Sequence, residues 1–199
     1  TADKMAAWGK IFRDIWVENG VEASRIVLTG APRLDTLVKR KFNERKYREQ
    51  AGIPLGKKLV VFATQPSYAT NNPYDMTVRV LKALKKFPEC AFAVKTHPME
   101  DPKKYKEILK NSGSDAIVLH KTDLYELLNT ASALITYNST VGFEAMLLGT
   151  PVIIFASNQE HVREYNLTDA VLRARNDKEF EQALEAALND KGKVRELKR

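Results

Sequence analysis

The residues best placed for chemistry lie between positions 134 and 155, where a polar turn, Asn138-Ser139-Thr140, joins an apolar segment to a short helical pattern. A polar turn that opens a helix presents backbone N–H groups and hydroxyls at the positive end of the helix dipole, and such an end attracts anions. The pattern therefore predicts a phosphate-binding turn, with Asn138, Ser139 and Thr140 as the ligands.

Glu144 lies one helical turn beyond this polar turn, surrounded in the sequence by apolar residues. A carboxylate close to buried positions needs partners, because an unpaired buried charge is costly. The two vicinal hydroxyls of a ribose, one turn from a bound phosphate, would meet that need, so Glu144 is the predicted ribose ligand. In the alternative interpretation, Ser139 or Thr140 only caps the helix and Glu144 lies on the surface.

A histidine follows a second apolar segment, in a Lys-Thr-His-Pro sequence at positions 95–98. Imidazole can donate a hydrogen bond to a phosphate oxygen or exchange a proton. We expect His97 to bind a phosphate of the same ligand; a catalytic acid or base role and a structural role are the alternatives. His120 and His161 have weaker contexts. No residue is a convincing catalytic base, so we assign none.

Two further segments follow apolar runs and could contact the rest of a nucleotide. The polar loop 64–73 contains Gln65 and Ser67, which could bind the phosphates or sugar of a donor, since long ordered loops are often functional. Lys121 follows the apolar segment 116–119, where backbone groups could also bind a base edge. The alternatives are a solvated loop and a solvated cation.

Several kinds of site have no counterpart in the sequence. It contains no His-x-x-x-His pair, Asp-x-Asp motif, Gly-x-Ser-x-Gly elbow or Walker loop, so we predict no metal site and no cofactor besides a nucleotide substrate. The single Cys90 excludes an internal disulfide, and we expect a reducing, cytoplasmic setting. No apolar run approaches the roughly 20 residues that span a bilayer.

The charge balance is basic, with a formal net charge of +7. The densest cationic run lies at 39–48, where Glu44 interrupts the lysines and arginines. A solvated helix face is one interpretation, and peripheral contact with an anionic membrane at its inner face is the other. No nucleic-acid-binding signature accompanies the run, so we expect no nucleic-acid partner.

The elements that position these groups alternate between apolar strands and amphipathic helices. We expect strands at 1–7, 25–29, 59–63, 91–95, 116–119, 134–137, 152–155 and 170–173, and helices at 10–19, 34–50, 74–86, 102–111, 124–130, 141–148 and 177–189. Continuous apolar strands that alternate with helices predict a doubly wound, Rossmann-like α/β domain with a parallel sheet. Ligands of such sheets bind at the carboxyl ends of the strands, where all the groups above lie.

The sequence predicts two parts. Residues 1–54 are interpreted as the trailing elements of a preceding domain with an interdomain linker, and residues 55–199 as a nucleotide- or nucleotide-sugar-binding Rossmann-like domain.

Four segments, taken in order, resemble the C-terminal half of a GT-B glycosyltransferase. Residues 26–35 resemble the segment between the two Rossmann-like domains, and 95–98 resemble the His-Pro motif of bacterial sialyl- and capsule polysaccharide transferases and of CDP-glycerol glycerophosphotransferases. Residues 138–140 resemble their Ser-Ser/Thr phosphate motif. Residues 141–153 resemble the general GT-B donor-site helix, whose glutamate binds ribose.

This resemblance implies that His97, Ser139 and Thr140 bind the donor phosphates and that Glu144 binds the ribose. The implied activity is metal-independent transfer from a UDP- or CMP/CDP-linked nucleotide-sugar, in surface polysaccharide or glycolipid synthesis. The acceptor site and catalytic base would belong to a missing N-terminal domain, so this part alone would be inactive. The alternatives are an enzyme like UDP-N-acetylglucosamine 2-epimerase, a CDP-glycerol-type phosphotransferase and a non-catalytic nucleotide-binding module.

Overall fold

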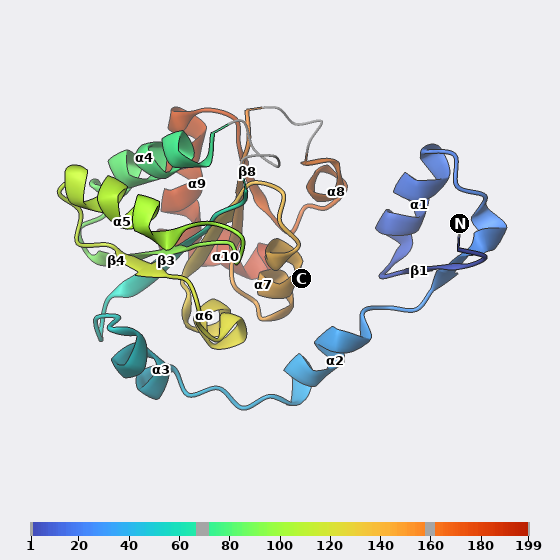
Figure 1. Cartoon of the computed structure of the whole chain (residues 1–199), viewed down its shortest axis with the longest axis horizontal. Helices are drawn as coiled ribbons and strands as arrows, with labels where there is room; N and C mark the ends of the chain where they lie inside the picture. Colours follow the sequence, from blue (N-terminus) through green and yellow to red (C-terminus); the bar gives the residue numbers. More distant parts are fainter. Residues whose placement is uncertain (1, 67–71, 158–161, 199) are drawn as a thin grey trace.

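A parallel sheet forms the centre of the computed structural model, which describes residues 2–66, 72–157 and 162–198 (Figure 1). Its strands are β3 Lys58–Ala63, β4 Cys90–Lys95, β5 Ile117–Leu119, β6 Ala133–Thr136, β7 Val152–Phe155 and β8 Leu172–Ala174. They pair in the order β5-β4-β3-β6-β7-β8, and every pairing is parallel. The strand order therefore reverses between β3 and β6, and the prediction of a doubly wound α/β domain is confirmed.

Five of the strands, β3 to β7, supply side chains to two separate cores, because successive residues of a strand point to opposite faces. In β3, Val60 and Phe62 pack into one core, while Leu59 and Val61 pack into the other. The first core lies under α4 Pro73–Leu84, α5 Pro102–Asn111 and α9 Asp177–Asn189. The second lies under α3 Glu44–Ala51, α6 Leu124–Thr130, α7 Val141–Leu147 and α8 Arg163–Asn166. Helices on both faces keep the strands dry, which explains their continuous apolar sequences.

Side-chain caps set the starts of several helices. Asp101, Asp123 and Asn176 each accept a hydrogen bond from a backbone N–H in the first turn of α5, α6 and α9. Such caps satisfy donors that the helix itself leaves unpaired. The predicted helices at 102–111, 124–130 and 177–189 are confirmed at these bounds.

The prediction of one helix over 34–50 is wrong. The segment forms α2 Pro32–Lys39 and then α3, with extended backbone at Arg40 between them. Asn43 starts α3 anew, because its side chain accepts a hydrogen bond from the backbone N–H of Lys46 at 3.0 Å. Arg40 meanwhile pairs with Asp123 at 2.5 Å, which ties the interruption to α6.

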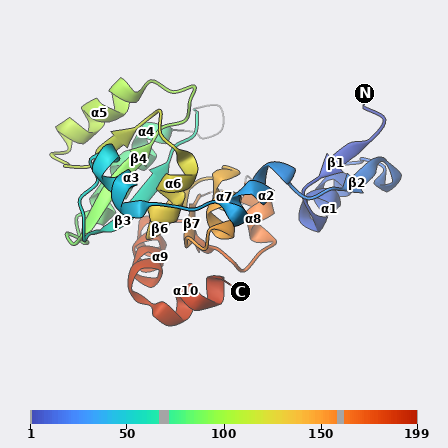
Figure 2. The ribbon, with the colours of Figure 1, turned by 90° about the horizontal axis from the view of Figure 1, so that it is seen from below.

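Two helices were not expected from the sequence. Both are short: α8, and α10 Lys191–Leu197, which follows α9 after a turn at Asp190. Asp190 caps α10 by accepting a hydrogen bond from the backbone N–H of Lys193 at 2.9 Å. Figure 2 shows α9 and α10 together at the C-terminal end of the domain.

The N-terminal residues form a separate small unit of β1 Met5–Ala7, α1 Lys10–Glu18, the 3₁₀ turn η1 Ala23–Arg25 and β2 Ile26–Leu28. The strands β1 and β2 pair in parallel, and Figures 1 and 2 show the unit beside the main sheet, joined to it through α2. Phe12 of α1 meets Phe143 of α7 with ring centroids 5.4 Å apart. Val27 and Leu28 remain exposed.

The segment that precedes the predicted boundary at residue 55 packs onto the sheet domain. Tyr47 and Ile53 are buried in the second core. Arg40, Arg45 and Arg48 of the basic run form ion pairs with acidic side chains, which offsets part of its charge. The domain boundary and the membrane contact stay predictions. Within the described ranges, the helices are too short or too polar to cross a membrane.

The two arginines of α3 allow a matched test of this packing. The Arg48 side chain is 7% exposed and donates to Glu44, to the Pro54 carbonyl at 2.9 Å and to the Thr130 carbonyl at 3.5 Å. Arg48→Met is expected to lower the free energy of unfolding by about 1–3 kcal/mol, because it leaves carbonyls without donors. Arg45 is 83% exposed, so Arg45→Met should change it by no more than about 0.5 kcal/mol. Urea denaturation measures both; equal losses would contradict the role given to Arg48.

Candidate functional site

A cavity of about 520 Å³ opens at the carboxyl ends of β3, β4, β5 and β6, next to the point where the strand order reverses. Its walls carry mainly cationic and hydroxyl side chains, and Glu144 is the carboxylate among them. The lining residues are Arg33, Ala63, Thr64, Lys95, Thr96, His97, Pro98, His120, Lys121, Thr122, Leu124, Ser139, Thr140, Val141 and Glu144. Excess positive charge in a concave site favours an anionic ligand.

The structure brings most of the predicted site residues together. His97, Lys121, Ser139, Thr140 and Glu144 all line this cavity, although they come from three separate segments of the chain. Asn138 and Gln65 lie beside it and contact each other. Ser67 lies outside the described residues.

Glu144 is buried, with a side chain 4% exposed, and it has a protein partner. The guanidinium of Arg33, which is 53% exposed, pairs with its Oε1 at 2.6 Å. Burial raises the pKa of Glu144 above its ordinary value, and Arg33 works in the opposite direction. Sequence reasoning found Glu144 but not Arg33, since nothing in the local pattern links α2 to α7. A ligand hydroxyl would therefore share Glu144 with Arg33 or displace it.

The turn that carries His97 is held by Glu100. This carboxylate accepts hydrogen bonds from the Thr64 hydroxyl, the backbone N–H of His97 and the Tyr105 hydroxyl, which come from the end of β3, the turn itself and α5. Tyr105 is fully buried, and burial raises the pKa of its phenol. Glu100 was not predicted as a site residue. It fixes the position of His97 without lining the cavity.

The imidazole of His97 has a defined orientation. Its Nδ1 accepts a hydrogen bond from the backbone N–H of Met99 at 3.2 Å. A ring nitrogen that accepts from an N–H carries no proton, so in neutral His97 the proton sits on Nε2. Nε2 is then a hydrogen-bond donor, which suits a phosphate oxygen.

The ends of β4 and β5 are joined by a hydrogen bond between buried Thr96 and His120. The Thr96 Oγ1 and the His120 Nδ1 lie 2.8 Å apart. Lys95 donates to the carbonyl of Thr96 at 2.7 Å, and burial lowers the pKa of its ammonium. These contacts hold together the part of the cavity wall that comes from the ends of β4 and β5. His120 therefore belongs to the site, although its sequence context was weak.

The polar turn at 138–140 is anchored from β3. The Gln65 amide donates to Asn138 Oδ1 at 2.6 Å, and the backbone N–H of Asn138 donates to Gln65 Oε1 at 2.8 Å. Ser139 Oγ accepts from the backbone N–H of Val141 at 3.4 Å, whereas Thr140 provides no side-chain cap for α7. The Thr140 hydroxyl thus remains available at the cavity wall. Phosphate binding by this turn stays a prediction.

A glycine and a tyrosine hold the start of α7 in place. A Cβ at Gly142 would lie 2.2 Å from the Tyr165 hydroxyl oxygen, so the close approach requires glycine. The Tyr165 hydroxyl donates to the carbonyl of Ser139, and its ring stacks on Phe143 with centroids 4.5 Å apart. The position of the polar turn thus depends on α8 as well as on β3.

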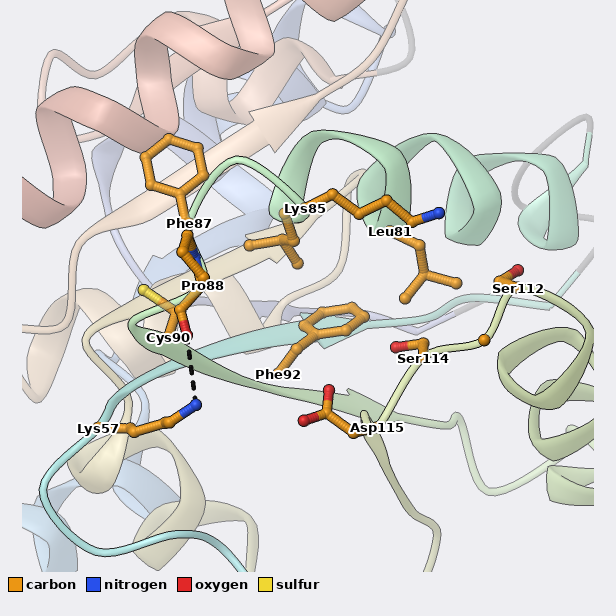
Figure 3. Close-up of a pocket in the computed structure, with 12 residues that line it drawn as sticks. Lys57, Leu81, Lys85, Phe87, Pro88, Cys90, Phe92, Ser112, Ser114 and Asp115 are labelled. Atoms are coloured by element: carbon orange, nitrogen blue, oxygen red, sulfur yellow. Dashed lines mark hydrogen bonds between the residues drawn. The ribbon is translucent and has the colours of Figure 1, made fainter.

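A different cavity, with apolar walls, lies near the amino ends of β3, β4 and β5. Figure 3 shows a cavity of about 280 Å³ there, walled by Leu81 and Phe92 and rimmed by Lys57, whose ammonium donates to the Pro88 carbonyl at 3.2 Å. Cys90 lies in its wall, and burial raises the pKa of the thiol, which disfavours the reactive thiolate. None of the predicted site residues lies in this cavity. Among the described residues, no cluster of three or more His, Cys, Asp or Glu side chains could hold a metal ion.

A comparison with protein-family models decides the family. The model described as CDP-Glycerol:Poly(glycerophosphate) glycerophosphotransferase matches residues 3–174. The chain belongs to this family. The glycerophosphotransferase match includes every residue of the cavity described above. A search of curated proteins found no match.

Solved structures agree in fold. The wall teichoic acid polymerase TagF matches at a TM-score of 0.62 and 19% identity over 98% of this chain and 52% of its own. A putative UDP-N-acetylglucosamine 2-epimerase from Listeria monocytogenes matches at 0.70 and 16%, over 100% and 54%. S. aureus MnaA, solved with UDP, matches at 0.72 and 16%, over 99% and 55%. The chain thus spans about half the length of these structures, and the predicted resemblance to the C-terminal half of a GT-B fold is confirmed.

The buried carboxyl of Glu144 makes stability depend on pH. A carboxyl whose pKa is higher in the folded state binds its proton more tightly there, so the free energy of unfolding falls as pH rises from the unfolded pKa through the folded one. Glu144→Gln removes this titration. The stability of the wild type relative to Glu144→Gln is therefore expected to decrease with rising pH across that window and then level off. Urea denaturation at a series of pH values measures it; a difference that increases with pH would contradict the assignment.

Proposed function

We propose that this chain is the donor-binding half of a metal-independent transferase that moves glycerophosphate from CDP-glycerol to a poly(glycerophosphate) acceptor. The family match over residues 3–174 supports this donor and acceptor. The nucleotide-sugar glycosyltransferase expected from the sequence would use the same donor-binding half. The acceptor site and catalytic base would lie in the part that the matched structures have beyond this chain.

One observation carries the proposal: the predicted phosphate ligands and the predicted ribose ligand line a single cavity. His97 reaches it from the end of β4, while Thr140 and Glu144 reach it from the start of α7 and its first turn. A nucleoside diphosphate has its charged phosphates at one end and its ribose hydroxyls further along, so its phosphates can contact His97 and Thr140 while its ribose contacts Glu144. The exposed side chain of Arg33 can move from Glu144 toward the phosphates as the ribose binds.

His97 acts as a phosphate ligand in this proposal. Because Met99 N–H occupies Nδ1, Nε2 presents a proton to the cavity and is not a base. A donor aimed at a phosphate oxygen stabilises the charge that develops there during transfer. Lys121, which follows β5 and lines the same cavity, adds a positive charge for the same purpose.

The reaction then proceeds as an in-line displacement at phosphorus. The oxygen of an acceptor hydroxyl attacks the phosphorus that carries the glycerol, a new P–O bond forms, and the P–O bond to CMP breaks. CMP leaves with the bonding electron pair, and the hydroxyl proton passes to a base outside this chain. Positioning and charge stabilisation are the main contributions that a protein makes to phosphoryl transfer.

A second candidate is a sugar-nucleotide 2-epimerase, because structures described as UDP-N-acetylglucosamine 2-epimerases match this fold at TM-scores of 0.70 and 0.69. An epimerase isomerises its sugar nucleotide without an acceptor. Incubation of the full-length protein with UDP-N-acetylglucosamine alone, followed by product analysis, separates the two activities: an isomerised product would replace the transferase proposal. Nucleotide binding without any turnover of donor and acceptor would instead indicate a binding module.

Donor binding is the first test. Calorimetry and thermal shift of this chain with CDP-glycerol, CDP, UDP and UDP-N-acetylglucosamine are expected to show the tightest binding and the largest rise in Tm with CDP-glycerol. Glu144→Ala should weaken CDP-glycerol by about 10- to 100-fold, since it removes a charged hydrogen-bond partner of the ribose. Glu107→Ala, an exposed change on α5, is the matched control and should bind normally. Unchanged affinity in Glu144→Ala would refute the ribose assignment.

His97 can be tested with a pair of ligands that differ only in phosphate. His97→Ala is expected to weaken CDP by about tenfold or more and to leave cytidine unchanged, because the lost donor contacts the phosphate alone. Calorimetry on both ligands measures this, with Lys106→Ala, an exposed change on α5, as a control for a substitution outside the cavity. Equal losses for CDP and cytidine would show that His97 is structural.

A further inference from the structure

A third pocket, of about 540 Å³, lies at the amino ends of β3, β6 and β7, whereas the candidate donor site lies at the carboxyl ends of the strands. The start of β3, the residues that precede β6 and β7, and the helices α9 and α10 form its walls. Figure 2 shows α10 closing this end of the domain. Four of its lining side chains are cations and one is acidic: Lys58, Lys191, Arg195, Lys198 and Asp190.

Three of these cations form one stripe along α10 and its C-cap residue, Lys198. Lys191, Arg195 and Lys198 are spaced by four and three residues, so they share one face of the helix. The rise of the helix separates them by about 6 Å and 4.5 Å along its axis. All three line the pocket. In the part of the chain that the structure describes, their side chains make no hydrogen bond or ion pair, whereas Lys193 on another face pairs with Glu196 at 3.1 Å.

The other two charged side chains of the pocket, Lys58 and Asp190, have hydrogen-bond partners within the protein. Lys58 donates to the Leu188 carbonyl and to Asn189 Oδ1, both at 2.7 Å. Asp190 accepts the backbone N–H of Lys193 and so caps α10. Like charges three and four residues apart on a helix repel each other. Among the described residues that line the pocket, Asp190 is the single acidic side chain against four cations, so a positive charge remains that a bound polyanion would offset.

We infer that this pocket binds the poly(glycerophosphate) chain itself, at a distance from the transfer site. The inference rests on the proposed function, which makes a phosphodiester polymer the acceptor and product. A flexible phosphodiester chain can present successive phosphates to cations at the spacing of the stripe. Its phosphates carry no base or ring to recognise, which fits a site whose charged side chains are mainly cations, beside apolar residues such as Leu148 and Val194.

The position of the pocket gives it a role in holding the polymer. The strands between the two sites are four to six residues long, so the two openings are separated by roughly 13–20 Å. A polymer of several units can reach from one opening to the other around the domain. Binding of its distal part would raise the effective concentration of its growing end at the transfer site. Short acceptors would not gain from this.

The test measures binding of a labelled long glycerophosphate oligomer to this chain by fluorescence anisotropy. The triple variant Lys191→Ala/Arg195→Ala/Lys198→Ala is compared with Lys82→Ala/Lys106→Ala/Lys110→Ala, which removes equal charge from exposed positions on α4 and α5. The stripe variant is expected to bind at least about tenfold more weakly and to lower the slope of log K against log salt by about 2. The control should lose less than about twofold. Arg195→Gln alone, expected to weaken binding severalfold, serves if the triple variant fails to fold.

Three results would overturn the inference. Equal losses in both triple variants would show that only net charge matters. If inorganic phosphate displaces the labelled oligomer as effectively as an unlabelled long oligomer does, the pocket is a simple anion site. Phosphatidylglycerol vesicles that bind through the stripe, while the oligomer does not, would assign the pocket to a lipid surface.

A parallel titration with CDP-glycerol separates this inference from the proposed function. The stripe variant should bind CDP-glycerol like the wild type, because its substitutions lie at the amino ends of the strands. Loss of oligomer binding with intact CDP-glycerol binding supports both proposals. If the protein binds the oligomer through the stripe but does not bind CDP-glycerol, the polymer site is supported and the donor assignment is refuted.

Discussion

The parallel pairing of β3 with both β4 and β6 is the constraint on which the rest of the structure depends. Parallel neighbours cannot be joined by a tight turn, so each connection runs through a crossover that returns the chain from the carboxyl end of one strand to the amino end of the next. β3 pairs over its whole length with β4 and on its other side with β6, which places the reversal of strand order at its carboxyl end. Thr64, His97 and the 138–140 turn leave the sheet at this one point. The cavity between them is a consequence of topology.

Two carboxylates at this edge are used in different ways. Glu100 accepts from Thr64, His97 and Tyr105 and is satisfied within the protein, so it serves as a rigid support for the His97 turn. Glu144, in contrast, lines the cavity and has a partner in Arg33 whose side chain is exposed. A carboxylate with a replaceable partner can bind a ligand, whereas one with three fixed donors cannot give them up without losing the turn. The two carboxylates differ because Thr64 and Tyr105, which bind Glu100, are buried, whereas Arg33, which binds Glu144, is exposed.

The sequence predicted those features that depend on local patterns. Continuous apolar runs gave the strands, and capping residues such as Asp101 and Asp123 explain why α5 and α6 begin where expected. The split between α2 and α3 had a local signal in Asn43 followed by Glu44, but the charged pattern on both sides outweighed it. Arg33, Glu100 and His120 have roles set by partners on other elements, and one sequence without homologues contains no signal that pairs them.

The ion pair of Arg33 with Glu144 also links the site to the N-terminal unit. Arg33 lies in α2, between that unit and the sheet domain, and its guanidinium is stacked 5.1 Å from the ring centre of Trp8. In the proposed donor complex, a ribose that binds Glu144 would compete with the Arg33–Glu144 ion pair, so the observed affinity would be the difference between the new hydrogen bonds and the ion pair that is lost. The released guanidinium would stay beside the cavity, where a donor phosphate would be a suitable new partner. The proposed function therefore implies that ribose and phosphate recognition are coupled through one arginine, and that a ligand with only one of the two groups would not obtain the full stabilisation.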